Sequence, residues 1–222
     1  NPKLIKEAQI AGFEILYLLI NSEKLNDKFN DIQCLDRIEV NDAVFKLFSN
    51  TCNSQGVIGI IKNFEQKLDM PKGNFLILDS LQDPGNIGTL LRTACGANFK
   101  DVYLVNCVNM MNDKLIRSSM GAIFKLNVYE CTKTEFLAFR NNNLKNIEIY
   151  VGDLQGENVF DVAPNKQFGI VLGNEGNGVC DEMKKIATKS ISIPMKNNLE
   201  SLNVAVAGAI VMYELNKNNI KN

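Results

Sequence analysis

Residues 168–215 read FGIVLGNEGNGVCDEMKKIATKSISIPMKNNLESLNVAVAGAIVMYEL, and this stretch decides the fold of the chain. The apolar run at 169–172 is typical of a strand buried on both faces. A glycine-rich turn, a short helix and a second strand at 190–195 follow, and Pro194 is expected to end that strand. A polar loop then leads into a long apolar helix, for which Ser201 is the predicted N-cap. The polar residues of this stretch fall almost entirely at the junctions between these elements, where functional sites tend to lie.

The turn at 173–178 contains Gly173, Gly176 and Gly178. Glycine can adopt positive φ, and it lets the main chain approach a bound group closely. The spacing differs from a dinucleotide fingerprint, and no Gly-Lys-Ser/Thr follows as in a phosphate loop. Glu175 places a carboxylate in the tightest part of the turn. A binding loop and a simple chain reversal therefore both remain open.

The last helix is apolar on two sides. One stripe consists of Val204, Ala207, Gly208, Val211, Met212 and Leu215, and the other consists of Val206, Ile210 and Tyr213. A helix with two apolar faces needs two partners. We assign one stripe to the helix's own sheet and the other to a second subunit, with burial in one large core as the alternative.

The composition is that of an ordinary globular protein, with 45% apolar and 22% charged residues among 222. There is no signal-like start, and no apolar run approaches the roughly 20 residues that span a bilayer. The chain begins at Asn1 rather than Met, so we expect that an upstream segment is missing. These features predict a cytoplasmic protein without a membrane partner.

The reactive side chains are limited by the absence of histidine. The six cysteines show no CxxC pair, so we expect free thiols in a reducing cytosol and no metal site. Any general base must come from another residue type. Because 24 basic residues face 25 acidic ones, nucleic-acid binding would depend on a local patch and on shape.

Two domains are predicted, at residues 1–66 and 72–222. The first shows a helical pattern from Leu4, strands at 14–20 and 57–61, and a capped helix at 42–49. A polar linker at 63–74 carries Pro71 and Gly73. The second domain starts with a strand at 75–78, and further strands are predicted at 102–106 and 147–152.

A turn at 83–86 precedes a helix predicted to begin near Ile87. Arg92 lies off the apolar face of that helix, which for an arbitrary helix indicates a solvated charge. Further along, Lys114, Arg117 and Ser119 could donate to RNA phosphates, or they could belong to an ordinary helix surface.

Three segments resemble the ordered motifs of the SpoU, or TrmH, family of RNA ribose 2'-O-methyltransferases in the SPOUT superfamily. They are LDSLQDPGNIGTLLRTACGANF at 78–99, GIVLGNEGNGV at 169–179 and ISIPMKNNLESLNVAVAGAIVMYE at 191–214. The resemblance implies a parallel α/β domain with a C-terminal deep trefoil knot, S-adenosylmethionine as the cofactor, and a homodimer formed through the C-terminal helix. The first domain resembles the small ribosomal-protein-like substrate-binding domain that precedes many such enzymes.

The resemblance also implies roles for site residues. The cofactor would be held by Leu172, Gly173, Ile193, Met195 and Leu202, and the ribose and its phosphate would be faced by Asn86, Arg92, Glu175, Ser201 and Asn203. Lys114, Arg117 and Ser119 match a family pattern as well. We expect Arg92 to anchor the phosphate and stabilise developing alkoxide charge, because a guanidinium pKa above 12 argues against a general base.

The implied function is methyl transfer to a ribose 2'-hydroxyl, in ribosomal RNA rather than transfer RNA because of the first domain. Two other functions stay open, namely transfer-RNA 2'-O-methylation and an RNA-binding assembly factor whose methylation is incidental. A doubly wound dehydrogenase is disfavoured, since the glycine fingerprint is not correctly spaced.

Overall fold

The computed structural model of the chain describes residues 1–25, 27–51, 53–62, 66–164, 166–197 and 199–220. It divides into two compact units, Asn1–Phe64 and Glu65–Asn222. Part of the predicted linker, residues 63–65, lies outside the described residues. Within the described ranges, no helix combines the length and the apolar character needed to cross a membrane.

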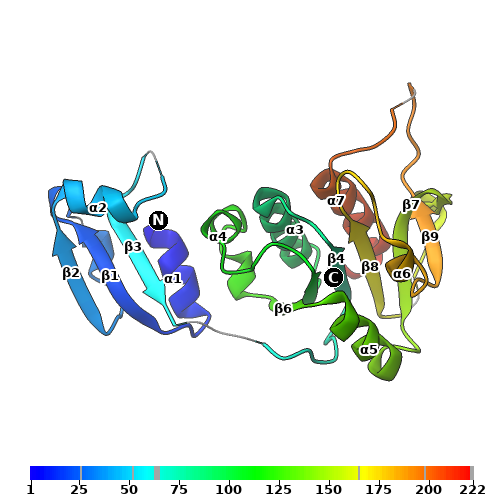
Figure 1. The fold of residues 1–222 in the computed structure, drawn as a ribbon, viewed down its shortest axis with the longest axis horizontal. Coiled ribbons are helices and arrows are strands. Elements are labelled where there is room, and N and C mark those ends of the chain that lie inside the picture. The colour runs from blue at the N-terminus through cyan, green and yellow to red at the C-terminus, as the bar shows by residue number, and fades with distance from the viewer. Residues whose placement is uncertain (26, 52, 63–65, 165, 198, 221–222) are drawn as a thin grey trace. The chain divides into compact units, whose positions relative to one another are not determined.

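The first unit is a three-stranded sheet with two α-helices (Figure 1). Its elements are α1 (Pro2–Ile10), β1 (Ile15–Asn21), β2 (Asp36–Val40), α2 (Asp42–Phe48) and β3 (Val57–Ile61). The strand order is β2-β1-β3, with β1 parallel to β2 and antiparallel to β3. All of these except β2 agree with the prediction. Strand β2 was missed because it is an edge strand whose residues are largely exposed, so it lacks an apolar pattern.

The second unit contains a six-stranded sheet in the order β6-β5-β4-β8-β7-β9, and its strand pairs are all parallel. The strands are β4 (Phe75–Asp79), β5 (Asp101–Val105), β6 (Asn127–Cys131), β7 (Glu148–Asn158), β8 (Phe168–Gly173) and β9 (Lys189–Ser192). The helices are α3 (Pro84–Gly96), α4 (Asp113–Ser118), α5 (Lys133–Asn143), α6 (Asp181–Lys184), α7 (Val204–Leu215) and α8 (Lys217–Ile220). This confirms the predicted α/β class with a parallel sheet.

The sheet of the second unit is covered on both faces. Every residue of β4 and β5 is buried, as expected for central parallel strands between helices. On one face, Tyr103 stacks on Tyr129 with ring centroids 5.1 Å apart, and Phe136 of α5 packs against Tyr103. The continuous apolar runs in the sequence therefore reflect burial on two sides.

Three predicted boundaries were wrong. Helix α3 begins at Pro84, because the Asp83 side chain caps it by accepting from the Gly85 N–H at 2.8 Å. Strand β9 ends at Ser192 rather than continuing to Met195. The N-cap of α7 is Asn203 instead of Ser201, since its Oδ1 accepts from the first-turn amides at 2.9 and 3.3 Å. Strand β6 and helix α5 were not predicted, although Thr132 and Glu135 form a capping box that the sequence contains.

The strand order of the sheet changes direction between β4 and β8. These strands are neighbours, yet the chain continues from β4 to β5 on one side and from β8 towards β9 on the other. Ligands bind at such a switch point, outside the carboxyl ends of the strands. Helix α7 packs closely here, because a Cβ at Gly208 would lie 2.4 Å from Leu90 Cδ2 and 2.6 Å from Leu172 Cδ1. The loop from β9 to α7 stands out from the sheet (Figure 1).

Candidate active site

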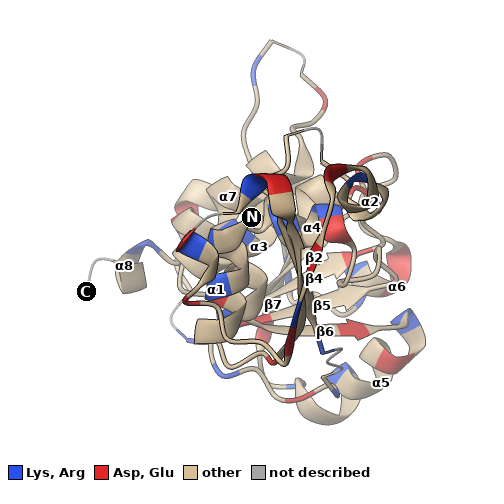
Figure 2. Ribbon diagram, turned by 90° about the vertical axis from the view of Figure 1, so that its left-hand side faces the viewer, with Lys and Arg blue, Asp and Glu red and all other residues tan. Residues whose placement is uncertain are grey.

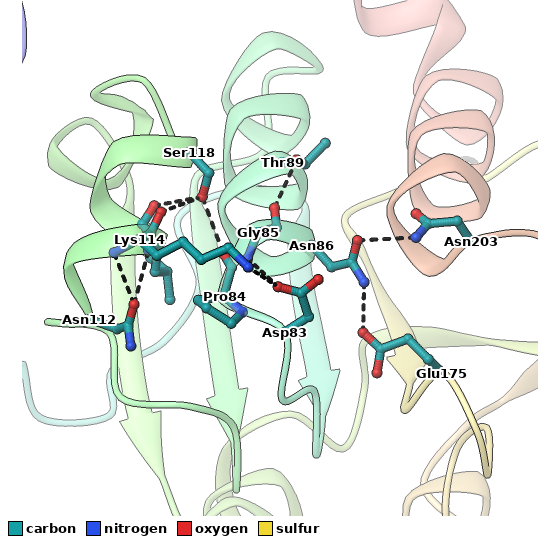
Figure 3. Close-up of polar contacts among 11 residues, drawn as sticks. Asp83, Pro84, Gly85, Asn86, Thr89, Asn112, Lys114, Ser118, Glu175 and Asn203 are labelled. Atoms are coloured by element: carbon teal, nitrogen blue, oxygen red, sulfur yellow. Dashed lines mark hydrogen bonds and ion pairs between the residues drawn. The ribbon is translucent and has the colours of Figure 1, made fainter. Parts of the chain in front are cut away.

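Three polar side chains from distant parts of the sequence meet outside the carboxyl ends of β4 and β8 (Figure 3). Asn86 lies in the first turn of α3, Glu175 in the loop after β8, and Asn203 at the N-cap of α7. Asn86 Nδ2 donates to Glu175 Oε1 at 2.8 Å, and Asn203 Nδ2 donates to Asn86 Oδ1 at 3.1 Å. An ionised carboxylate only accepts, so Glu175 fixes which end of the Asn86 amide carries the donors.

The amide of Asn86 retains capacity for a ligand. Its Nδ2 has a second N–H, and its Oδ1 has a second lone pair beyond the bonds to Glu175 and Asn203. Glu175 and Asn203 are solvent-exposed, and Asn86 is partly exposed. The cluster can therefore orient an incoming hydroxyl group by hydrogen bonding.

The loop after β8 is held by Asn174. Its Nδ2 donates to the Ser80 carbonyl at 3.0 Å, which joins this loop to the one after β4. Its Oδ1 accepts from the Gly176 N–H at 2.9 Å, and its main chain bridges to Gly178. A Cβ at Gly173 would lie 2.2 Å from the Gly178 carbonyl carbon, so only glycine fits there. The loop at 173–178 is thus tightly folded and is fixed to the loop that follows β4.

A buried carboxylate, Asp79, supports the same pair of loops from beneath. It is 1% exposed, accepts from the Cys180 N–H at 2.9 Å, and accepts from the Ser80 hydroxyl at 3.0 Å. Neither Asp79 nor Asn174 was predicted from the sequence to have a role at the site. A charged residue that directly ends an apolar strand run was the available clue for Asp79.

A cavity of ≈ 570 Å³ lies beside the glycine-rich loop at 173–178. Its volume is within the size range of small-molecule sites. Its walls come from the irregular middle part of β7, from the ends of β8 and β9 with the loops that follow them, and from α6 and α7. The residues predicted to hold a cofactor all line it, namely Leu172, Gly173, Ile193, Met195 and Leu202. Ser201 and Glu175 also line it. The lining combines apolar side chains with charged ones, which suits a nucleoside carrying a charged substituent, so the residues present fit S-adenosylmethionine.

Arg92 is not brought into the cavity within one chain. It is exposed on α3 and absent from the cavity lining. Six residues of helix separate it from Asn86, which amounts to about 9 Å along the axis. Across the part of the chain that the structure describes, the Arg92 side chain has no hydrogen-bond or ion-pair partner. Its guanidinium is thus available to a partner molecule.

The predicted phosphate-binding residues differ in accessibility. Lys114 Nζ forms an ion pair with Asp83 Oδ1 at 3.1 Å and remains largely exposed (Figure 3). Arg117 forms an ion pair with Asp113 on the same helix. Ser119 is fully buried, and its hydroxyl donates to the Ile116 carbonyl at 2.8 Å. The prediction that Ser119 contacts RNA is therefore wrong for this conformation.

Charge and pKa values fit a site without strongly basic character. Lys and Arg residues and Asp and Glu residues are both scattered over the ribbon (Figure 2). The pKa of Asp83 lies below its ordinary value because the Gly85 N–H and Lys114 favour the charged carboxylate. Asp83 therefore neutralises part of the positive potential of Lys114 near the first turn of α3.

Two of the thiols, those of Cys107 and Cys131, are poor nucleophiles because they are buried. Burial raises the pKa of Cys107 and of Cys131 to about 12, so neither is a thiolate at neutral pH. Cys34, Cys95 and Cys180 are also free thiols, whereas Cys52 lies outside the described residues. Among the side chains that are described, no group of three or more His, Cys, Asp or Glu could hold a metal ion.

The chain is similar to known RNA methyltransferases. The family model described as the SpoU rRNA Methylase family matches residues 73–213. The chain is 29% identical over 218 residues to the 23S rRNA (guanosine(2553)-2'-O)-methyltransferase RlmP of Bacillus subtilis, covering 96% of this chain and 85% of that protein. It is 32% identical to an uncharacterized tRNA/rRNA methyltransferase of Borreliella burgdorferi, covering 70% and 71% of the two chains.

A solved structure shares the fold over the whole chain. It is the SpoU methyltransferase AviRb from Streptomyces viridochromogenes in complex with the cofactor AdoMet, with a TM-score of 0.88 at 20% identity. The match covers 100% of this chain and 89% of that one.

Proposed function

This chain belongs to the SpoU rRNA Methylase family, and from that premise we propose that it transfers the methyl group of S-adenosylmethionine to a ribose 2'-hydroxyl in ribosomal RNA. The observation that carries this proposal is the junction of the hydrogen-bonded cluster Asn86–Glu175–Asn203 with the cavity, since Glu175 belongs to both. A methyl donor in the cavity would lie beside groups that can orient a hydroxyl.

The chemistry needs alignment more than activation of the donor. S-adenosylmethionine, when bound, supplies an electrophilic methyl group on a sulfonium. The protein must then hold the hydroxyl for in-line attack and help it to lose its proton. The free N–H of Asn86 would donate to the ribose oxygen and stabilise its developing negative charge.

The other predicted residues would support this arrangement. Glu175 would orient Asn86, while Ser201 and Asn203 would contact the ribose at the cavity mouth. We keep Arg92 as the group that binds the RNA phosphate, with the proton leaving through phosphate or water. Lys114 and Arg117 would add further phosphate contacts on the same unit.

A dimer is the proposed assembly, and it would give Arg92 a role in a complete site. Val206 and Tyr213 on the outer face of α7 are 50% and 46% exposed, which is unusual for large apolar side chains that lie together on one helix. Arg92 is exposed on α3, the helix that packs against α7. Sedimentation of a Tyr213→Glu variant as a monomer would support this interface.

We further propose that the C-terminal segment forms the deep trefoil knot and that residues 1–66 are an RNA-binding domain preceding the 72–222 methyltransferase domain. The similarity over 96% of this chain to a 23S rRNA methyltransferase supports ribosomal RNA as the target. Transfer RNA remains the alternative substrate, because the relative from Borreliella burgdorferi is named for both. An assembly factor with incidental methylation is the second alternative.

The test is transfer of tritiated methyl groups to ribosomal RNA and to transfer RNA, followed by mass-spectrometric mapping of ribose methylation. Wild-type protein should label ribosomal RNA, while Asn86→Ala should label it far more slowly and Arg92→Ala should not label it. The control is Asn143→Ala, another helical asparagine, which is exposed on α5. Calorimetry should show binding of S-adenosylmethionine but not of NADH. Labelling that is independent of Arg92, or labelling of transfer RNA alone, would contradict the corresponding part of the proposal.

A further inference from the structure

An ion pair in the cavity wall has no part in the proposed methyl transfer. Lys184 Nζ lies 2.9 Å from Asp153 Oδ2, and both residues line the cavity. Asp153 follows Gly152 at a register shift of β7, where the ladder to β9 stops at Gly152 and resumes at Glu157. Its Oδ1 accepts from the Gln155 N–H at 3.1 Å. Lys184 is the last residue of α6. The main chain therefore directs this pair of opposite charges towards the cavity.

The charges of the cavity lining limit what the pair can bind. The charged residues in the lining are Asp153, Glu175, Lys184 and Glu200. Lys184 is thus the only cation among the described residues that line the cavity. A ligand carboxylate that leaves bulk water needs a charged or hydrogen-bonding partner. Lys184 is therefore the one side chain of this lining with which a ligand carboxylate could form an ion pair.

We propose that Lys184 and Asp153 form the subsite for the zwitterionic amino-acid end of S-adenosylmethionine, an inference that rests on the proposed function. Lys184 binds the α-carboxylate and Asp153 binds the α-ammonium. In this arrangement each charged group of the ion pair meets a ligand group of the opposite charge. An ammonium group has three donors, so Lys184 can contact Asp153 and the ligand at once.

The position of the pair predicts a specific kinetic effect. The amino-acid end is unchanged by methyl transfer, so contacts to it are equally strong before and during the reaction. Such uniform binding lowers KM for the cofactor and leaves kcat unchanged. Loss of Asp153 or Lys184 should therefore raise KM for S-adenosylmethionine at constant kcat, unlike loss of Asn86.

The direct test is calorimetry with two ligands that differ only in this group. S-adenosylhomocysteine carries the amino-acid end, whereas methylthioadenosine lacks it. Asp153→Asn and Lys184→Met should each weaken S-adenosylhomocysteine binding by roughly 10- to 100-fold, the range for charged hydrogen bonds. Binding of methylthioadenosine should change less than about twofold. Matched controls are Glu182→Gln and Lys133→Met, which break a 3.4 Å ion pair that also involves α6 but lies outside the cavity lining.

The outcomes are distinguishable. A parallel loss for both ligands, or unchanged S-adenosylhomocysteine binding, would overturn the head-group assignment while leaving the proposed function intact. Wild-type protein that binds neither ligand would overturn the proposed function and this inference with it. If Asp153→Asn does not fold, as judged by thermal melting, Lys184→Met alone decides the question, because its side chain is 43% exposed.

Discussion

Substituting Gly173 by alanine tests whether the glycine-rich loop must fold as tightly as described. A Cβ at Gly173 would lie 2.2 Å from both the Gly178 carbonyl carbon and the Val179 nitrogen. Carbon atoms normally approach to about 3.5–4.0 Å, and main-chain atoms cannot rotate aside as a side chain would. The strain of such overpacking is typically about 1–3 kcal/mol.

This strain can be relieved in two ways, and each has its own assay. If the loop keeps its conformation, the free energy of unfolding falls by about 1–3 kcal/mol in denaturant titrations. If the loop moves instead, stability is retained, and affinity for S-adenosylhomocysteine falls by about 5- to 150-fold, since 1.4 kcal/mol is tenfold. The loss of unfolding free energy and the loss of binding free energy should together amount to about 1–3 kcal/mol, whether or not the loop moves.

Gly176 is the matched control in the same loop. A Cβ there would meet only Asn174 Oδ1, at 3.5 Å, which is ordinary van der Waals contact. Gly176→Ala should therefore leave both the unfolding free energy and the affinity near wild type. The reasoning is refuted if Gly173→Ala changes neither quantity, or if the two variants lose the same amount.

Three further predictions follow from the contacts described. Asn86→Ala should lower kcat by about 10²–10³-fold, as does the loss of an oxyanion donor. Cofactor affinity measured by calorimetry should be unchanged. Equal losses of kcat and of cofactor affinity would instead indicate a binding role. Asn216→Ala should lower the unfolding free energy by about 1–3 kcal/mol, because Asn216 is 1% exposed and donates to the Ala97 carbonyl at 2.6 Å. A loss of unfolding free energy no larger than that caused by replacing an exposed asparagine would contradict this prediction. The pKa of Asp83 is lowered in the folded protein, so its carboxylate stabilises the fold at pH values above the unfolded-state pKa near 3.8. This contribution to the unfolding free energy is lost as the pH falls through the folded-state pKa. Asp83→Asn should therefore flatten the stability curve below about pH 4 in acid titrations followed by circular dichroism.

The sequence predicted elements where burial imposes an apolar pattern. Strands β4, β5 and β8 were found because both faces of each are covered. Edge strand β2 was missed because exposure leaves its composition unconstrained. The order of strands in the sheet could not be derived either, since it depends on long-range packing that no local pattern encodes.

At the site, local rules were ambiguous where tertiary contacts decide. Ser201 and Asn203 are equally good N-cap residues by composition. Asn203 is the cap, and in that position its Nδ2 also reaches Asn86, a residue that no local rule relates to it. Arg92 was selected from the family motif alone, and its role stays a prediction. Asn174 was overlooked because its function is to join two loops that are distant in sequence.

The hydrogen-bonded cluster Asn86–Glu175–Asn203 joins segments that are 89 and 117 residues apart in the chain. Closing such long loops costs entropy that only a nearly complete fold can offset. Intermediates with a formed sheet but an undocked α7 would then have most of the scaffold and would lack the contact of Asn203 with Asn86. Enzymatic activity should accordingly appear as a late event in refolding, after the spectroscopic signal of secondary structure has recovered.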